Sequence, residues 1–419
     1  MQEQPTRGSK AIPMSSGSAQ DLAPILQALR ARLSEAGYTP TALKQGLGIT
    51  YPDDVGLLNR TPALERLRDD RSPAGSLIRL LFLEGAEPER RVAGVLSRKL
   101  YGELLRCGLL QRSDGGVRAQ LRIDPVADQH FIADRRFRPG TTRAFGLPGR
   151  DPVYPPSSDS LILRDAILAP DARRVLDLCT GSGVQALRLA PGAEAHGTET
   201  HRAETHRAER IVAVDLNPRA AAMARLNAQL NGITNLDVRV GDLYAPVGSE
   251  QFDLIIANPP FVASPYASGP AYHSGGNVGD TVLRRIIAGW STRLARGGRA
   301  FAITHRALRA GEDVETVARA WFRSFPGRVL VLILERGTAV DLAAAQALFA
   351  LRQGLAAYGR EVTRWIDHLR RLRVSTVAVL LIAAERRDEQ QLEVIEAQPR
   401  MLPIPLTLPV TDRIANWFR

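Results

Sequence analysis

The chain has 419 residues, of which 44% are hydrophobic and 24% charged, so it is long enough for two domains with separate cores and has the composition of an ordinary soluble protein. Its formal net charge is +11, and arginine supplies nearly all of the positive charge because lysine occurs only three times. This excess favours a polyanionic partner electrostatically, although a biased codon composition explains it equally well. Two cysteines cannot build a disulfide framework, and no apolar run reaches the length of a membrane span, so we expect a cytoplasmic protein that binds no membrane.

The first 150 residues carry no motif of recognisable chemistry. Residues 1–20 are rich in Ser, Gly and Pro, lack a signal-peptide core and are predicted to be a disordered tail. Residues 21–150 are predicted to form a smaller, mainly helical domain, in which apolar residues such as Leu26 and Leu29 recur at helical spacing. A turn signal at 113–116 between two β-like runs adds a hairpin. The domain is therefore either winged-helix-like or a small helical domain packed against the rest of the chain.

From residue 151 onwards, short apolar strands alternate with helices. Strands are predicted at 174–179, 210–214, 236–240, 252–257, 299–304, 328–334 and 374–384, with helices at 182–190, 218–231, 278–292 and 312–325. Such alternation predicts an α/β domain over residues 151–419, with a parallel sheet covered by helices on both faces. Ligands of such sheets bind beyond the carboxyl ends of the strands.

Two insertions interrupt this alternation. Residues 191–209 contain a tandem copy of Glu-Thr-His-Arg-Ala, and residues 339–373 add a long helical stretch before the last strand. The duplicated segment holds His196, His201 and His206, but a five-residue spacing does not place three imidazoles on one helical face, so we predict no metal site. We interpret the duplication as a solvent-exposed loop and expect the second insertion to extend one edge of the ligand site.

The strand at 174–179 runs into a loop with two glycines, Gly181 and Gly183, before the next helix. Glycines at such a bend let backbone N–H groups and the helix N-terminus approach a ligand closely. The spacing also fits the looser dinucleotide fingerprint Gly-x-Gly-x-x-Ala, so the loop alone does not exclude a dinucleotide-dependent dehydrogenase. The features that argue for another ligand are Asp177, four residues before the first glycine, and a second motif downstream.

That second motif is Asn258-Pro259-Pro260-Phe261, which ends the apolar strand at 252–257. Two prolines hold the backbone stiffly and supply no N–H donors. The side-chain carbonyl of Asn258 and the backbone carbonyl of Pro259 therefore make two acceptors on one rigid corner, which suits an NH2 group. Phe261 is placed to stack on the flat face behind that nitrogen. The alternative is a tight turn after a core strand.

Together, the glycine loop, Asp177 and the Asn-Pro-Pro-Phe corner resemble the class I S-adenosylmethionine (SAM) methyltransferases that methylate planar nitrogens. Residues 153–160, and Gly275-Gly276 followed by residues 283–287, are similar to the release-factor glutamine methyltransferases. The RNA guanine-N2 methyltransferases share the same core. The resemblance covers residues 153–384 and implies a Rossmann-like sheet, SAM as the cofactor, and no metal.

The resemblance also implies a role for each motif residue. Asn258, Pro259 and Phe261 are the expected catalytic residues, whereas Tyr154, Pro260 and His273 are expected to contact the methyl acceptor. The expected SAM-binding residues are Asp177, Thr180, Gly181, Gly183, Asp215, Leu216, Asp242, Leu243 and Asn258.

Two of these assignments have simpler alternatives. Asp215 is expected to bind the ribose hydroxyls but is also placed to cap the following helix, and Asp242 is expected at the adenine amino group but is also a common turn residue. His305 has no carboxylate at triad spacing, so we assign no catalytic base.

The sequence therefore predicts an N-methyltransferase whose acceptor is a macromolecule, either a glutamine in a protein or an exocyclic amine of an RNA base. Residues 21–150 are then expected to recognise that acceptor. Small-molecule N-methylation in a biosynthetic pathway and nucleic-acid binding by an inactive methyltransferase fold are the alternatives. The identity of the acceptor does not follow from the sequence.

Overall fold

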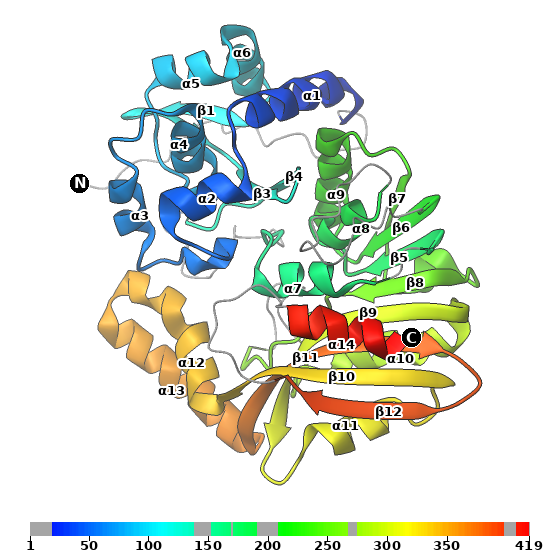
Figure 1. Cartoon of the computed structure of the whole chain (residues 1–419). Coiled ribbons are helices and arrows are strands. Elements are labelled where there is room, and N and C mark those ends of the chain that lie inside the picture. Colours follow the sequence, from blue (N-terminus) through cyan, green and yellow to red (C-terminus); the bar gives the residue numbers. More distant parts are fainter. Residues whose placement is uncertain are drawn as a thin grey trace.

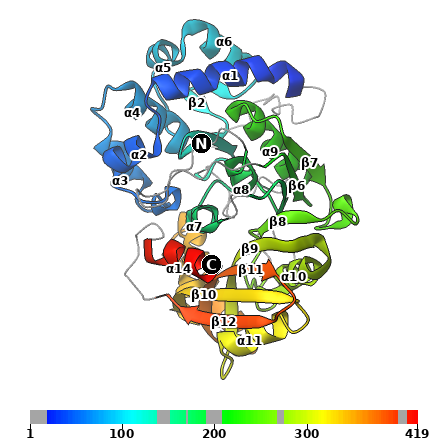
Figure 2. The ribbon, with the colours of Figure 1, turned by 45° about the vertical axis from the view of Figure 1, so that its right-hand side comes forward.

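The computed structural model describes residues 19–137, 152–168, 171–190, 208–266, 275–397 and 408–418. The predicted tail up to residue 18, most of the duplicated insertion and His273 lie outside the described residues. Figures 1 and 2 show two parts, a mainly helical N-terminal part and a part built around one large sheet.

The N-terminal part consists of short helices followed by two hairpins. Its elements are α1 (Ala19–Glu35), α2 (Pro40–Leu47), η1 (Pro52–Asp54), α3 (Arg60–Arg66), α4 (Pro73–Leu77), η2 (Ile78–Phe82), α5 (Glu89–Leu96), α6 (Arg98–Arg106), β1 (Leu110–Ser113), β2 (Gly116–Ala119), β3 (Arg122–Val126) and β4 (Gln129–Ala133). The predicted hairpin at 113–116 is present as the antiparallel pair β1–β2. The second hairpin, β3–β4, was not predicted from the sequence. It contains a fully buried ion pair between Arg122 and Asp124. Charged residues are rarely buried, so they interrupt the apolar pattern from which a strand is predicted.

The second part is an eight-stranded sheet in the order β12-β10-β11-β9-β8-β5-β6-β7. Its strands are β5 (Arg174–Leu178), β6 (Arg210–Asp215), β7 (Leu236–Val240), β8 (Phe252–Ala257), β9 (Leu294–Arg309), β10 (Gly327–Thr338), β11 (Val374–Arg386) and β12 (Gln391–Glu396). Strands β7, β6, β5, β8 and β9 run parallel, and β11 is antiparallel to both of its neighbours. The edge strand β12 was not predicted from the sequence.

Helices cover both faces of this sheet, as predicted. One face packs against α7 (Ser158–Ala166), α8 (Val184–Arg188), α9 (Pro218–Asn231) and α14 (Leu408–Phe418). The other packs against α10 (Thr281–Arg293) and α11 (Val314–Trp321), and a short turn η3 (Ala245–Val247) precedes β8. Neighbouring strand residues alternate between the faces, so Val175 lies in one core and Leu176 in the other.

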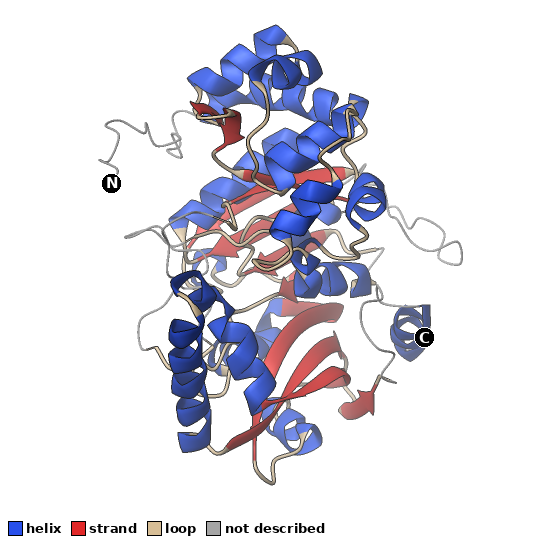
Figure 3. Cartoon of the chain, turned by 90° about the vertical axis from the view of Figure 1, so that its left-hand side faces the viewer, coloured by secondary structure: helices blue, strands red, loops and turns tan. Residues whose placement is uncertain are grey.

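The N-terminal part shares its core with the sheet-containing part through α9. Met223 and Leu230 of α9 lie in the same apolar cluster as the leucines of α1. Asn227 and Asn231 of α9 also exchange hydrogen bonds with the backbone of β4 at Ile132 and His130. Figure 3 shows the helices of the N-terminal part above the sheet.

The insertion at 339–373 consists of two helices joined by a turn: α12 (Ala339–Ala347), η4 (Leu348–Gln353) and α13 (Leu355–Arg371). Gly354 has a φ of 100°, which a side chain would not readily adopt, and it separates the turn from α13. In Figure 1 the pair lies on the same side of the molecule as α2 and α3.

Candidate active site

The glycine loop follows β5 at the carboxyl edge of the sheet. Cys179, Gly181 and Gly183 all have positive φ values, of 58°, 57° and 88°, so the chain turns sharply before α8. A Cβ on Gly183 would lie 2.8 Å from the Leu187 side chain, so no other residue fits there without displacing this side chain. Cys179 has a side chain and is therefore held in a strained conformation, which is typical of functional sites.

Two carboxylates accept hydrogen bonds from this loop. Thr180 Oγ1 donates to Asp177 Oδ2 over 2.6 Å, and the N–H of Gly181 donates to Asp215 Oδ2 over 2.9 Å. Asp177 is fully buried beneath the loop, and burial raises its pKa to about 7. The α9 N-cap is Asn217, whose side chain accepts from Arg219 N, so the capping role considered for Asp215 belongs to another residue.

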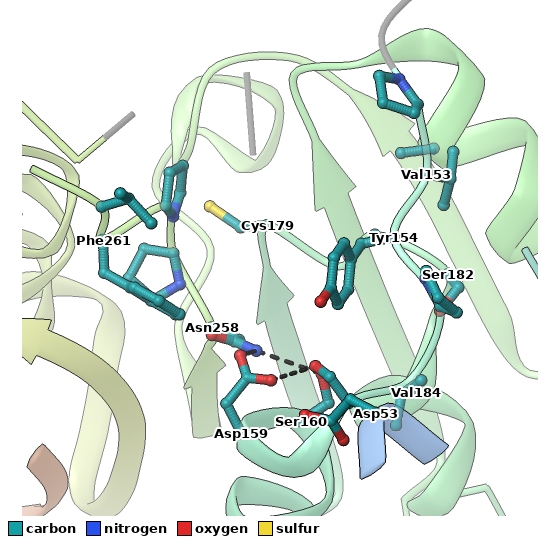
Figure 4. A pocket seen from close by; sticks show the side chains of 18 of the residues that line it. Asp53, Val153, Tyr154, Asp159, Ser160, Cys179, Ser182, Val184, Asn258 and Phe261 are labelled. Carbon is teal, nitrogen blue, oxygen red and sulfur yellow. Dashed lines mark hydrogen bonds between the residues drawn. The ribbon is translucent and has the colours of Figure 1, made fainter. Parts of the chain in front are cut away.

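The Asn-Pro-Pro-Phe corner follows β8, next to β5 in the sheet. Asn258 Nδ2 donates to Asp159 Oδ2 over 2.9 Å and lies 3.4 Å from Ser160 Oγ, both at the start of α7 (Figure 4). Asp159 in turn accepts a short hydrogen bond from Ser157 Oγ. Asn258 Oδ1 is buried and has no hydrogen-bond partner within the described residues. An ionised carboxylate only accepts hydrogen bonds, so Asp159 fixes the NH2 end of the amide and leaves its carbonyl oxygen available.

Phe261 is supported from behind by an imidazole. The rings of Phe261 and His305 are stacked with centroids 4.1 Å apart and an interplanar angle of 18°. Burial lowers the pKa of His305, so its ring is neutral at neutral pH. The backbone at Gly275 and Gly279 passes so close that a Cβ would lie 2.7 Å from Phe261 Cα and 2.3 Å from Phe261 O, respectively. A side chain at Gly275 or Gly279 would therefore collide with the backbone of Phe261.

Both motifs open into one cavity of about 830 Å³. The predicted residues that line it are Tyr154, Thr180, Gly181, Asp215, Leu216, Asp242, Leu243, Asn258, Pro259, Pro260 and Phe261. Asp177 and Gly183 support the loop and are absent from this lining, and His273 lies outside the described residues. No group of three or more potential metal ligands occurs in the part of the chain that the structure describes. Nor is any helix there long and apolar enough to cross a bilayer.

Comparisons with known proteins identify the family. A family model described as "Methyltransferase small domain" matches residues 158–321, and a "Domain of unknown function (DUF7059)" matches residues 35–120. A putative protein N5-glutamine methyltransferase of Methanocaldococcus jannaschii is 30% identical over 154 residues, which are 35% of this chain and 68% of that protein. The chain belongs to the class I SAM-dependent methyltransferases.

Other relatives of this methyltransferase carry related names. The release factor glutamine methyltransferase of Mycolicibacterium smegmatis is 28% identical over 56% of this chain and 86% of its own. That of Aliivibrio fischeri is 32% identical over 23% of this chain and 29% of its own. The methyltransferase thus spans less than a third of this last relative.

The rest of the cavity wall comes from segments that carry no methyltransferase motif. Gly56, Leu57, Leu58 and Asn59 belong to the N-terminal part, and the tip of the α12–α13 insertion contributes Ala345, Gln346, Leu348, Phe349 and Arg352. Sequence reasoning missed these residues individually, although it anticipated that the insertion reaches the site.

Asp53 of η1 links the N-terminal part to the corner of the methyltransferase. Its two carboxylate oxygens accept from Ser158 N and Ser158 Oγ, each over 2.8 Å, and its side chain lines the cavity. Ser158 precedes Asp159, the residue that holds Asn258. Asp53 and Asp159 were not predicted as site residues. Asp159 was detectable, because it lies within the motif at 153–160 and an acid is favoured in the first turn of a helix.

Proposed function

We propose that this protein transfers a methyl group from SAM to the side-chain amide nitrogen of a glutamine in another protein. The observation that carries the proposal is the carbonyl oxygen of Asn258, buried and without a partner among the described residues, and fixed in direction by Asp159. A buried acceptor without a donor costs free energy, so it is expected to gain one from a ligand. The incoming donor that suits it is an N–H of a planar NH2 group.

The donor half of the cavity is lined by the glycine loop, Asp215, Leu216 and Asp242, and its side chains suit SAM. SAM supplies an electrophilic methyl group on a positively charged sulfur. Burial raises the pKa of the Cys179 thiol, and so do the carboxylates of Asp215, Asp177 and Asp242, whereas Arg285 lowers it. Acidic side chains therefore outnumber basic ones around the glycine loop. A negative field stabilises a cationic ligand. Leu216, 61% exposed on the cavity wall beside Asp215, offers an apolar surface for the adenine ring.

Each donor-binding residue then has a defined task. Asp215 accepts from the ribose hydroxyls while it holds Gly181 N, and Thr180 and Gly181 shape the loop around the methionine part. Asp242 accepts from the adenine amino group. Its carboxylate already receives a hydrogen bond of 2.6 Å from Arg285 Nη2, which holds it at the rim.

In the acceptor half of the cavity, which contains the Asn-Pro-Pro-Phe corner, the residues catalyse the reaction by positioning the acceptor nitrogen. Asn258 Oδ1 and the carbonyl of Pro259 accept the two N–H groups of the glutamine amide, and Phe261 packs on its plane. The nitrogen lone pair then points along the line to the methyl group, and holding reactants in line accounts for most of the rate in such a reaction. The nitrogen–methyl bond forms as the sulfur–methyl bond breaks, the electron pair leaves with the sulfur, and the extra proton of the nitrogen passes to water.

The names of the relatives favour a protein acceptor. Among them are a ribosomal protein uL3 glutamine methyltransferase of Bradyrhizobium diazoefficiens, 38% identical over 27% of this chain, and the release factor enzymes above. An exocyclic amine of an RNA base offers the corner the same NH2 geometry and is the competing acceptor. Both cysteines of the chain are free in the structure, and we place the reaction in the reducing cytoplasm.

The test is a transfer experiment with the full chain. The protein is incubated with trideuteromethyl-SAM and a cell extract that is then split into protein, RNA and small molecules. We expect the heavy methyl group on a glutamine side chain of a protein, and none with the Asn258→Ala variant. Label that appears in RNA or in small molecules instead would refute the proposed acceptor.

A further inference from the structure

Asp134, directly after β4, is a buried carboxylate that binds two separate segments of the chain. Its Oδ2 accepts from Val153 N over 2.8 Å, and its own N–H donates to the carbonyl of Val153 over 3.2 Å. Both carboxylate oxygens also accept short hydrogen bonds from the guanidinium group of Arg219, in the first turn of α9. Such a bidentate pair fixes the orientation of its two partners as well as their distance.

The segment that begins at Val153 leads into the acceptor half of the cavity. Residues 153–155 line this cavity. Two successive prolines, Pro155 and Pro156, restrict φ and stiffen the short connection to α7. The first turn of α7 carries Asp159, which accepts from the Asn258 side chain. A shift at the start of this stiff segment is therefore passed on to the Asn-Pro-Pro-Phe corner.

The other partner of Asp134 belongs to the donor half of the cavity. Asn217 and Ala220, the neighbours of Arg219 at the start of α9, line the cavity. Arg219 N donates to Asn217 Oδ1 over 2.9 Å, and Ala220 lies in the same apolar cluster as Val153. Asp134 thus holds the donor wall and the acceptor wall against each other.

The residues expected to bind the donor have supports that do not involve Asp134. Asp215 accepts from Gly181 N and from Asn217 N, each over 2.9 Å. Asp134 and Arg219 are themselves absent from the cavity lining of the described residues. Loss of the Asp134 carboxylate should therefore leave the donor contacts in place and change the position of the acceptor wall relative to them.

We propose that Asp134 is a positioning residue for methyl transfer. It fixes residues 153–157 against α9 and so holds Asn258 at the distance from bound SAM that the in-line reaction requires. A misplacement of about 1 Å costs such a reaction about 100-fold in rate. This inference rests on the proposed function in one respect, that a methyl group passes from the donor half to the acceptor half. It makes the N-terminal part a component of the active site as well as a candidate for acceptor recognition.

The test compares two variants of the full chain with the wild type. Asp134→Ala should lower the rate of trideuteromethyl transfer to the cell extract about 10- to 100-fold at saturating SAM. The KM for SAM and the calorimetric affinity for S-adenosylhomocysteine should stay within about threefold, because only the transition state loses stabilisation. Asp134→Asn keeps one oxygen that can accept from Val153 N, and its rate should fall only about 3- to 10-fold.

A matched control separates positioning from stability. Glu87 is 3% exposed, and its two oxygens accept from Arg79 over 2.6 and 3.1 Å, so it forms the same kind of buried bidentate pair. Both residues lie in the N-terminal part and are absent from the cavity lining. Glu87→Gln should lower the melting temperature and leave the rate at saturating SAM unchanged. All rates are measured where circular dichroism shows the variant to be folded.

A rate of Asp134→Ala within about threefold of the wild type would overturn this inference and leave the proposed function standing. An equal loss in Glu87→Gln would also overturn it, as would a higher KM for SAM without a lower rate at saturation. If Asp134→Ala does not fold, the comparison of Asp134→Asn with Glu87→Gln decides in the same way.

The proposed function fails independently of this inference. Wild-type label in RNA or in small molecules would refute the glutamine acceptor, and the rates of the variants on that fraction would still test Asp134. A wild type that labels no fraction would overturn both proposals.

Discussion

Asn258 and Asp159 are 99 residues apart in the sequence, and their side chains are joined by a hydrogen bond of 2.9 Å in the wall of the cavity. The bond makes the two ends of the Asn258 amide inequivalent, because only the NH2 end can face a carboxylate. The direction of the Asn258 carbonyl oxygen, which we propose binds the acceptor amide, is thus set by helix α7, which precedes the glycine loop in the sequence.

Asn258→Ala should abolish methyl transfer and leave donor binding nearly intact, because the residue is proposed to act on the acceptor. Turnover is measured with labelled SAM and affinity by calorimetry with S-adenosylhomocysteine. Turnover within about threefold of the wild type, less than the loss of one neutral hydrogen bond predicts, would contradict the proposed corner.

Asp159→Ala should lower kcat by about 10- to 100-fold, because the amide of Asn258 is then free to rotate and loses a charge-assisted hydrogen bond. Asp159→Asn is the control, since its amide oxygen can still accept from Asn258 Nδ2. It should retain more activity than Asp159→Ala at equal melting temperature. Equal losses in the two variants would show that the charge of Asp159, rather than the orientation of Asn258, matters.

Asp53→Ala should reduce kcat in a folded protein, because Ser158 loses both of its bonds of 2.8 Å to the carboxylate and the start of α7 is released. Asp53→Asn should restore most of the activity, since an amide can accept from Ser158 N and donate to Ser158 Oγ. A loss confined to melting temperature, with kcat unchanged, would mean that Asp53 serves only to hold the two parts together.

The buried Asp177 should make stability depend on pH. Its pKa is raised from 3.8 to about 7, so the folded protein binds one proton more than the unfolded chain between these values, and stability falls as pH rises through this window. The effect amounts to at most about 4 kcal/mol. Asp177→Asn should remove it, so the variant should gain in melting temperature relative to the wild type between about pH 4 and 7. If the melting temperatures of the two proteins differ by the same amount at every pH, folding does not raise the pKa of Asp177.

A fragment that begins at residue 152 should be markedly less stable than the full chain. The cut uncovers the apolar face of α9, including Met223 and Leu230, and removes the β4 backbone that pairs with Asn227 and Asn231. Circular dichroism melting of the fragment and of the full chain measures the difference. Met223→Asp in the full chain should destabilise in the same direction. A fragment that melts as high as the full chain would establish residues 152–419 as an independent domain.

The local motifs and the sheet were accessible from the sequence alone. The glycine loop and the Asn-Pro-Pro-Phe corner depend on φ restrictions of residues next to one another, and the strand–helix alternation reports which residues are buried. These signals are local, so they placed Asn258, Asp215 and Gly181 at strand ends on the carboxyl edge of one sheet.

The tertiary structure decided which distant residues complete the site. Asp53, Leu58, Asp159 and Arg352 lie in unrelated segments, and nothing in their local patterns distinguishes them from ordinary caps and surface residues. They meet because α9 packs into the N-terminal core and the insertion packs onto the residues after Phe261. Such contacts depend on how the apolar faces of whole elements fit together, and this information is spread over the entire chain rather than held in any one stretch of it.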